Sequence, residues 1–242
     1  MPSLMAAFQF LTLVPPLIRR PFKPRELGRS LNYYPLVGLV LGLILYGANL
    51  GLSRLLGEAP RSALTLILWV LLVGGFHLDG FLDTLDGIFG GFQPEDRLEI
   101  MRDERVGAYG LAGGILLLLL KFTLISSLPT ASQALILVPV FSRWGMVFAL
   151  VVYPYARKEG LGSWMKENAG WQQLLAASLI ALLPAVYFFG LWGLGALLFS
   201  LVLTWLTAAF LLSRIPGLTG DNYGAINELL EVSLLLFFLG IS

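Results

Sequence analysis

Cysteine is absent from the 242-residue chain, and histidine occurs once. The absence of cysteine excludes disulfide bonds, zinc–thiolate sites and a cysteine nucleophile. Charge is also scarce, since 13% of the residues are charged and 57% are hydrophobic, against about 25% and 45–50% in soluble domains. So few charged side chains cannot cover the surface of a soluble globule of this length. The formal net charge of +1 gives no indication of a nucleic-acid partner.

This composition predicts an all-α, polytopic bundle embedded in a lipid bilayer. Only helices and closed barrels span membranes, and barrels show weak alternating patterns that are not seen here. No polar linker divides residues 1–242, so we expect a single integral membrane catalytic domain. A crossing helix needs about 20 apolar residues, and seven segments qualify: 33–53, 62–82, 108–128, 134–154, 172–190, 192–212 and 224–241.

Two of the apolar segments need separate treatment. The last one reaches full length only if Glu228 and Glu231 enter the membrane with it. The segment 4–18 is shorter and ends in Pro15-Pro16, and it lacks the basic leader and cleavage site of a signal peptide. We therefore expect an N-terminal interfacial or re-entrant helix in addition to the seven spans.

Lysine and arginine predict the orientation in the membrane, because positively charged segments stay on the cytoplasmic side. Placing the basic segment 19–29 inside puts 12 of the 16 basic residues on that side and two outside. The strongly polar loops 79–107, 155–171 and 213–228 then all face the cytoplasm. We therefore predict a multi-pass protein of the inner (plasma) membrane with its reaction site facing the cytoplasm.

Three aspartates after the second span carry the strongest chemical signal. Asp79, Asp83 and Asp86 are spaced i, i+4 and i+7, which places them within a stripe about 60° wide on one helix. Clustered carboxylates near a membrane are costly unless a cation neutralises them, and all-oxygen ligation favours Mg²⁺. A solvated helix end and an ion-coupling site of a transporter are the alternatives. His77 lies about 200° from Asp79 around the helix, which favours a packing or interfacial role.

A basic segment follows the glycine pair that should end this helix. We expect a short cytoplasmic helix that begins near Pro94 and carries Arg97, Arg102 and Arg105. The planar guanidinium group matches phosphate oxygens, so metal-binding carboxylates followed by arginines indicate phosphoryl or nucleotidyl chemistry. The alternative is an amphipathic, salt-bridged helix that only orients the protein, and this is the better interpretation of Arg97.

A second acidic cluster opens the last span. Asp221 and Glu228 are seven residues apart on one helical face, and Glu231 lies about 60° from Glu228. Two acidic helices that meet on one side of the membrane would hold one or two metal ions between them, although Asp221 would equally serve as an N-cap. Lys121 and Arg143 are the basic residues within predicted spans, and we expect them to pair with buried carboxylates before contacting any substrate.

These motifs together resemble the cobalamin synthase family, the adenosylcobinamide-GDP ribazoletransferases. The resemblance rests on the segments HLDGFLDTLDGIFGG, RLEIMRDERVGAYG and GLTGDNYGAINELLE. It extends to FQFLTLVPP, NYYPLVGLVLG, FSRWG and YPYARKEGLG, so that it runs from Phe8 to Glu231.

The resemblance implies an activity and a set of residues. A ribose hydroxyl of α-ribazole, or of α-ribazole 5′-phosphate, would attack the corrinoid-linked phosphate of adenosylcobinamide-GDP, releasing GMP and forming adenosylcobalamin or its 5′-phosphate. Mg²⁺ is the implied cofactor. The implied metal ligands are Asp79, Asp83, Asp86, Asp221 and Glu228, with Asp83 or Asp86 as candidate base; Arg102 and Arg105 contact phosphate, and Asp103 and Asn222 complete the substrate-binding motifs.

Other classes fit the sequence less well. A CDP-alcohol phosphotransferase pattern begins D-G-x-x-A-R, whereas Asp79-Gly80 is followed by Phe-Leu-Asp. A membrane prenyltransferase would need a long apolar groove for its lipid substrate. A transporter commonly has inverted repeats, and none is visible, while the polar residues are one-sided. A homo-oligomer is compatible with Gly38, Gly42 and Gly47, which would permit close helix packing.

Overall fold

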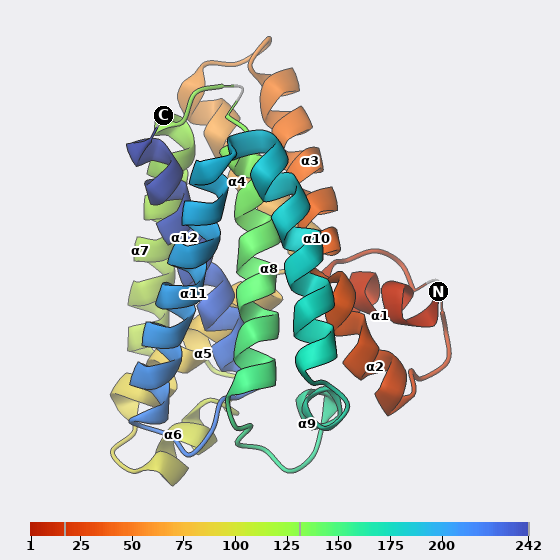
Figure 1. The fold of residues 1–242 in the computed structure, drawn as a ribbon. Helices are drawn as coiled ribbons and strands as arrows, with labels where there is room; N and C mark the ends of the chain where they lie inside the picture. Colours follow the sequence, from red (N-terminus) through yellow and green to blue (C-terminus); the bar gives the residue numbers. More distant parts are fainter. Residues whose placement is uncertain (17, 131, 242) are drawn as a thin grey trace.

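The protein is an all-α bundle. Its computed structural model describes residues 1–16, 18–130 and 132–241, and Figure 1 shows the arrangement of the helices. Over these residues the elements are α1 (Pro2–Leu11), α2 (Pro24–Ser30), the 3-10 turn η1 (Leu31–Tyr33), α3 (Tyr34–Leu52), α4 (Glu58–Val73), α5 (Phe76–Gly90), α6 (Pro94–Ile100), α7 (Ala108–Ser127), α8 (Ala134–Val152), α9 (Leu161–Glu167), α10 (Trp171–Phe189), α11 (Leu191–Leu212) and α12 (Gly220–Gly240).

Six of the seven predicted spans are confirmed as helices long and apolar enough to cross a membrane. They are α3, which continues α2 and η1 as Pro24–Leu52, and α7, α8, α10, α11 and α12. The last of them includes Glu228 and Glu231, as its length requires, and both side chains are buried. A shorter apolar helix, α1, stands where the N-terminal helix is expected.

The predicted span 62–82 is a pair of helices that together are long and apolar enough to cross a membrane but are sharply bent. Its first part, α4, ends at Val73, and α5 continues from Phe76 at an angle of 87°. Gly74 and Gly75 form the break, and both have φ of +74°, a left-handed conformation that glycine adopts at little cost. Hydropathy registers the apolar length across the two glycines but not their backbone conformation. The acidic stripe therefore lies on a separate helix that turns away from α4.

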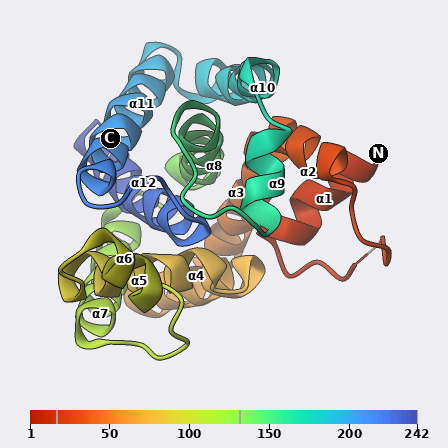
Figure 2. The same ribbon diagram turned by 90° about the horizontal axis from the view of Figure 1, so that it is seen from below.

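Helix α8 lies at the centre of the bundle, and Figure 2 shows it surrounded by α3, α10, α11 and α12. Its contact with α3 depends on two small residues. A Cβ at Gly38 would lie 2.2 Å from the Pro139 carbonyl oxygen, and one at Gly42 would lie 2.3 Å from that of Ile136. These two glycines are thus used for packing within the chain, whereas Gly47 has open space around its Cα.

Four charged side chains meet in the core, where α7, α8 and α12 adjoin. The Lys121 ammonium lies 2.6 Å from Glu228 and 2.5 Å from Glu231, and Arg143 pairs with Glu231. All four are almost fully buried. The expectation that Lys121 and Arg143 pair with carboxylates is confirmed, and two cations and two anions leave this cluster formally neutral.

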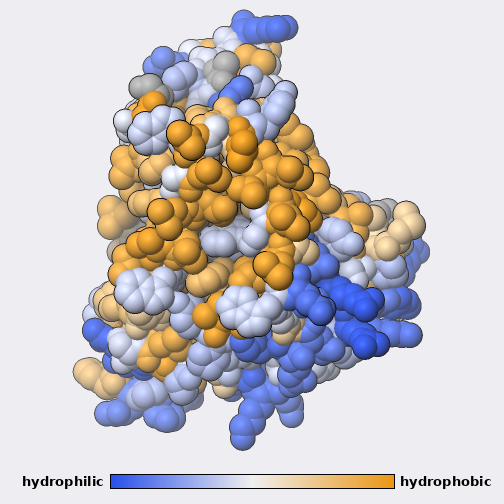
Figure 3. Space-filling model, viewed as in Figure 1, coloured by the Kyte–Doolittle hydropathy of each residue, from blue (hydrophilic) through white to orange (hydrophobic). Residues whose placement is uncertain are grey.

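The polar chemistry is concentrated at one end of the bundle. Helices α6 and α9 and the loops that join them to the long helices all lie at the lower end of Figure 1. In the space-filling view, an apolar band covers the middle of the molecule, and hydrophilic residues gather at the lower end and beside α2 (Figure 3). This distribution fits a bilayer-embedded body with one elaborated polar face.

Candidate active site

Helices α5 and α12 cross closely at two glycines. A Cβ at Gly80 would lie 2.8 Å from the Asp221 carbonyl oxygen, and one at Gly224 would lie 3.0 Å from that of His77. Contacts this short leave no room for a side chain at either position. The crossing therefore holds the acidic stripe of α5 against the first turn of α12, where Asp221 lies.

Burial increases along the stripe from Asp79, which is exposed, through Asp83, which is half-buried, to Asp86, which is 7% exposed. The charges of Asp79, Asp221 and Asp86 all act on Asp83, and Arg157 opposes them. The structure thus brings Asp79, Asp83 and Asp221 into one electrostatic group, as the two acidic motifs predict.

Asp86 has a different environment from the other two aspartates. Its carboxylate oxygens accept hydrogen bonds from the backbone amides of Gly107 and Gly110, each at 2.8 Å. These amides belong to the N-terminal turn of α7, where a negative charge stabilises unpaired donors and the helix dipole. A Cβ at either glycine would collide with the carboxylate. Asp86 therefore fastens α7 to α5, and its predicted roles as metal ligand and base stay predictions.

Arg157 is a site residue that sequence reasoning missed as a functional group. Its guanidinium donates to the Asp221 carboxylate at 2.7 Å, and the Thr219 hydroxyl donates to the same oxygen at 3.2 Å. The loop that carries Arg157 is held by a short bridge in which Ala156 and Leu218 pair through their backbones at 2.8 Å. The sequence signal was the segment YPYARKEGLG, in which this arginine was counted only as an orienting charge.

Asn222 is buried and connects α12 to α5. Its side-chain oxygen accepts from the Thr219 amide at 2.9 Å, and its side-chain nitrogen donates to the Thr84 hydroxyl at 3.0 Å. These bonds form the N-cap of α12 and secure the helix crossing. In the structure Asn222 positions Asp221, and its predicted contact with substrate stays a prediction.

The basic segment is arranged differently from the prediction. Helix α6 ends at Ile100, so that it carries Arg97, whereas Arg102 and Arg105 lie in the loop that follows. The reason is that Asp86 draws Gly107 towards α5 and the chain must leave the helix to reach it. Arg105 pairs with Asp103 at 2.7 Å with 87% of its side chain exposed, and this contact lowers the pKa of Asp103 to about 2. Both arginines are thus accessible to an incoming anion.

Glu228 does not join the α5 carboxylates. Although it lies on the same helix as Asp221, it is two turns deeper and pairs with Lys121 inside the bundle. The predicted grouping of Asp221 and Glu228 at one site is therefore not what the structure shows, because a buried lysine on α7 takes the place that a metal ion was expected to fill.

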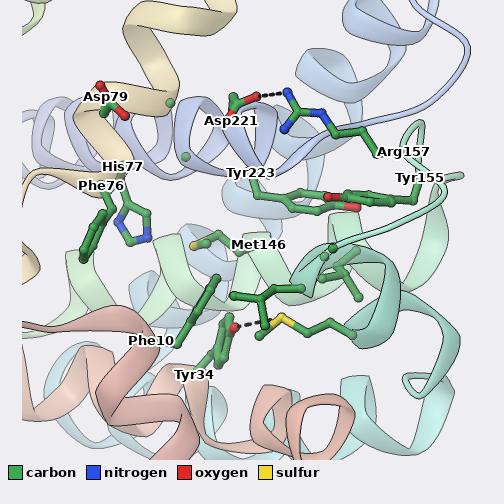
Figure 4. Close-up of a pocket in the computed structure, with 18 of the residues that line it drawn as sticks. Phe10, Tyr34, Phe76, His77, Asp79, Met146, Tyr155, Arg157, Asp221 and Tyr223 are labelled. Carbon is green, nitrogen blue, oxygen red and sulfur yellow. Dashed lines mark hydrogen bonds and ion pairs between the residues drawn. The ribbon is translucent and has the colours of Figure 1, made fainter. Parts of the chain in front are cut away.

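A cavity of about 550 Å³ opens beside Asp79 and Asp221 (Figure 4). Its walls come from α1, α3, α5, α8, α9, the loop after α8 and the start of α12. Figure 4 shows the acidic pair and Arg157 along one edge, with aromatic rings below them. The volume falls in the range of about 300–1,000 Å³ that is usual for small-molecule sites.

The carboxylates do not form a complete metal cage. Among the described residues, no three acidic, histidine or cysteine side chains are placed to hold an ion by themselves. Mg²⁺ in phosphoryl-transfer sites is commonly bound through one or two carboxylates, with water and substrate phosphate completing the shell. The mutual repulsion around Asp83 and the all-oxygen donor set fit that manner of binding.

The fold and this site define a polytopic, all-α membrane protein with an acidic pocket and exposed arginines at one polar end. The family model described as cobalamin-5-phosphate synthase matches residues 3–239. The chain therefore belongs to the cobalamin synthase family, and it is a transferase of cobalamin biosynthesis. This membership sets aside the CDP-alcohol phosphotransferase, the prenyltransferase and the transporter.

Curated relatives extend over nearly the whole chain. One from Desulforamulus reducens is 40% identical over 98% of this chain and 96% of its own length. One from Pseudomonas savastanoi pv. phaseolicola is 42% identical over 95% and 96%, and one from Desulfitobacterium hafniense is 37% identical over 99% and 96%. All three are named adenosylcobinamide-GDP ribazoletransferase. No solved structure matches the chain.

Proposed function

We propose that this protein transfers adenosylcobinamide phosphate from adenosylcobinamide-GDP to α-ribazole or α-ribazole 5′-phosphate. A ribose hydroxyl oxygen forms a bond to the corrinoid-linked phosphorus, the phosphoanhydride bond breaks, and GMP leaves. The hydroxyl proton passes to a carboxylate. The observation that carries the proposal is the α5–α12 crossing, which groups three carboxylates and Arg157 beside a cavity large enough for a nucleoside.

Asp83 is the best candidate for the group that accepts the proton. Asp86 already accepts two backbone hydrogen bonds, and Asp221 is paired with Arg157. Among the described residues no hydrogen bond or ion pair occupies the Asp83 carboxylate, and its partial burial, with the nearby carboxylates, favours its taking up a proton. Asp79 lines the cavity, which supports a position for it beside the attacking ribose.

Asp79 and Asp221 are the residues that would hold Mg²⁺, with Asp83 beside them as the base. When bound, the ion supplies positive charge that offsets the charge developing on the transferred phosphate. The arginines supply the remaining cationic groups of this chain. Arg102 and Arg105 are accessible on the loop before α7, and their planar groups would grip the pyrophosphate of the donor in a bidentate manner.

The reaction itself provides the direct test. The purified protein should release GMP from adenosylcobinamide-GDP only when both an acceptor and Mg²⁺ are present, and a chelator should stop the release. Chromatographic quantification of GMP and of the corrinoid product measures it. Absence of GMP with α-ribazole and with its 5′-phosphate, under Mg²⁺ or Mn²⁺, would refute the proposed function.

We also propose that the polar end faces the cytoplasm of the inner membrane. The segments at that end, together with the basic segment 19–29, carry 12 of the 16 lysines and arginines of the chain, and such segments are retained inside. A reporter inserted between α8 and α10, within residues 155–171, should give the cytoplasmic signal, and one inserted between α3 and α4 the periplasmic signal. The opposite pair of signals would overturn the orientation.

A further inference from the structure

Aromatic side chains line the interior of the cavity, whereas its acidic side chains lie along one edge. Phe10, Tyr34 and Phe76 line it, together with Tyr155 and Tyr223, whose rings stack with centroids 6.1 Å apart and planes 14° from parallel. In Figure 4 this pair lies below Asp221 and Arg157, with Met146 to its lower left. Flat apolar walls of this kind bind flat heterocycles through their faces. A volume of about 550 Å³ admits a nucleoside but not the far larger corrinoid.

The charged residues that line the cavity distinguish between the two nucleosides of the proposed reaction, the α-ribazole of the acceptor and the guanosine of the donor. Asp79, Glu159 and Asp221 line the cavity, and the cation Arg157 is already paired with Asp221. The described residues that line the cavity offer a guanosine pyrophosphate no unpaired lysine or arginine, and an ion held by Asp79 and Asp221 would keep its phosphates at the acidic edge, away from the aromatic interior. An uncharged base requires no such cationic partner. The lining therefore favours the base of the acceptor over the guanine nucleotide of the donor.

Two buried polar atoms on the cavity residues lack a partner among the described residues. They are Nδ1 of His77 and the hydroxyl oxygen of Tyr223, and both residues are at most 5% exposed. Buried polar groups are nearly always hydrogen-bonded. In Figure 4 the His77 ring points towards the cavity beside Phe76. A heterocycle with a ring nitrogen could form the missing hydrogen bond with the His77 ring or the Tyr223 hydroxyl.

We propose that this cavity binds the benzimidazole base of the acceptor nucleoside, whose ribose then lies towards Asp79 and Asp221. The base stacks against the Tyr155–Tyr223 wall, and His77 forms a hydrogen bond at its edge. This inference rests on the proposed function, because that function supplies the acceptor. It assigns the pyrophosphate of the donor to the outside of the cavity, on the side of Arg102 and Arg105.

Tyr155→Leu tests the inference, because it removes an aromatic face and keeps an apolar side chain. The Michaelis constant for α-ribazole, and for its 5′-phosphate, should rise roughly tenfold or more, as expected for loss of one base–aromatic stack. The constant for adenosylcobinamide-GDP should change less than twofold, and Tyr155→Phe should restore acceptor binding. Phe148→Leu is the matched control, since Phe148 stacks on Trp144 outside the cavity lining.

If Tyr155→Leu instead raised the Michaelis constant for adenosylcobinamide-GDP, the guanine nucleotide would belong in the cavity and the inference would be overturned. An unchanged Michaelis constant for α-ribazole would overturn it as well. Equilibrium binding of α-ribazole, without donor, separates this failure from failure of the proposed function. Binding that is lost in Tyr155→Leu and kept in Phe148→Leu supports the cavity assignment even if no GMP is released. In the unaltered protein, benzimidazole should displace α-ribazole and GMP should not; displacement by GMP alone contradicts the assignment whether or not the variants fold.

Discussion

Replacing Lys121 by methionine is expected to lower the free energy of unfolding by about 3–5 kcal/mol, the usual result of removing one member of a buried ion pair. Lys121 contacts Glu228 and Glu231 and lies 4.9 Å from the centre of the Trp69 ring. Glu231 keeps Arg143 as a partner in the variant. Glu228 loses the lysine with which it forms its salt bridge, and its negative charge is left in the bundle core without compensation. Reversible unfolding in mixed detergent micelles measures the loss.

A second substitution separates charge from packing. Adding Glu228→Gln to Lys121→Met removes the uncompensated carboxylate and should recover a large part of the lost stability. Lys158→Met, at an exposed lysine, is the control and should stay within about 0.5 kcal/mol of the unaltered protein. If the double variant were as unstable as the single one, the cost would come from packing and the ionic account of this cluster would be wrong.

Asp83→Asn is expected to reduce the rate of GMP release by a factor on the order of 10²–10³, typical for the loss of one preorganised charged group. The amide has nearly the same shape but does not accept the hydroxyl proton. Because Asp83 lies among the like charges of Asp79, Asp86 and Asp221, neutralising it also removes repulsion. Activity should therefore fall while thermal stability stays equal or rises, as single-turnover and unfolding measurements on the same preparation would show.

Glu99→Gln provides the matched control, because this carboxylate is exposed on α6 near the same polar end. Glu99→Gln should leave both the rate of GMP release and the thermal stability unchanged. Near-normal turnover in Asp83→Asn would remove Asp83 from the reaction. A joint loss of activity and stability would instead give Asp83 a structural role like that of Asp86.

Hydropathy and periodicity were sufficient for much of the architecture. The spans on either side of Gly190 were expected from a glycine-rich break, and the helices resume at Leu191, directly after that residue. The i, i+4, i+7 spacing placed Asp79, Asp83 and Asp86 on one helix, which α5 confirms. These predictions succeed because they depend on local spacing and on transfer of apolar side chains from water.

Features that depend on distant partners were not predictable from the sequence. Asp86 resembles its neighbours in spacing, and only the fold reveals that the amides of Gly107 and Gly110 occupy its oxygens. Arg157 resembles any cytoplasmic loop cation until the bridge at Leu218 brings it to Asp221. Each of these contacts joins residues that lie more than 20 positions apart, beyond any helical or strand repeat.

The hydrogen bonds from Gly107 and Gly110 to Asp86 also limit how far the arginine loop can travel. Arg105 is two residues before Gly107, so its Cα can lie at most about 7 Å from that anchored glycine. Arg102 directly follows Met101, which is 2% exposed and packed against Gly87 of α5. The loop backbone is therefore anchored at both ends beside the acidic helix, and the guanidinium groups can change position only by rotation of their side chains. Capturing a phosphate there orders two side chains rather than a whole segment, which keeps the entropic cost of binding small.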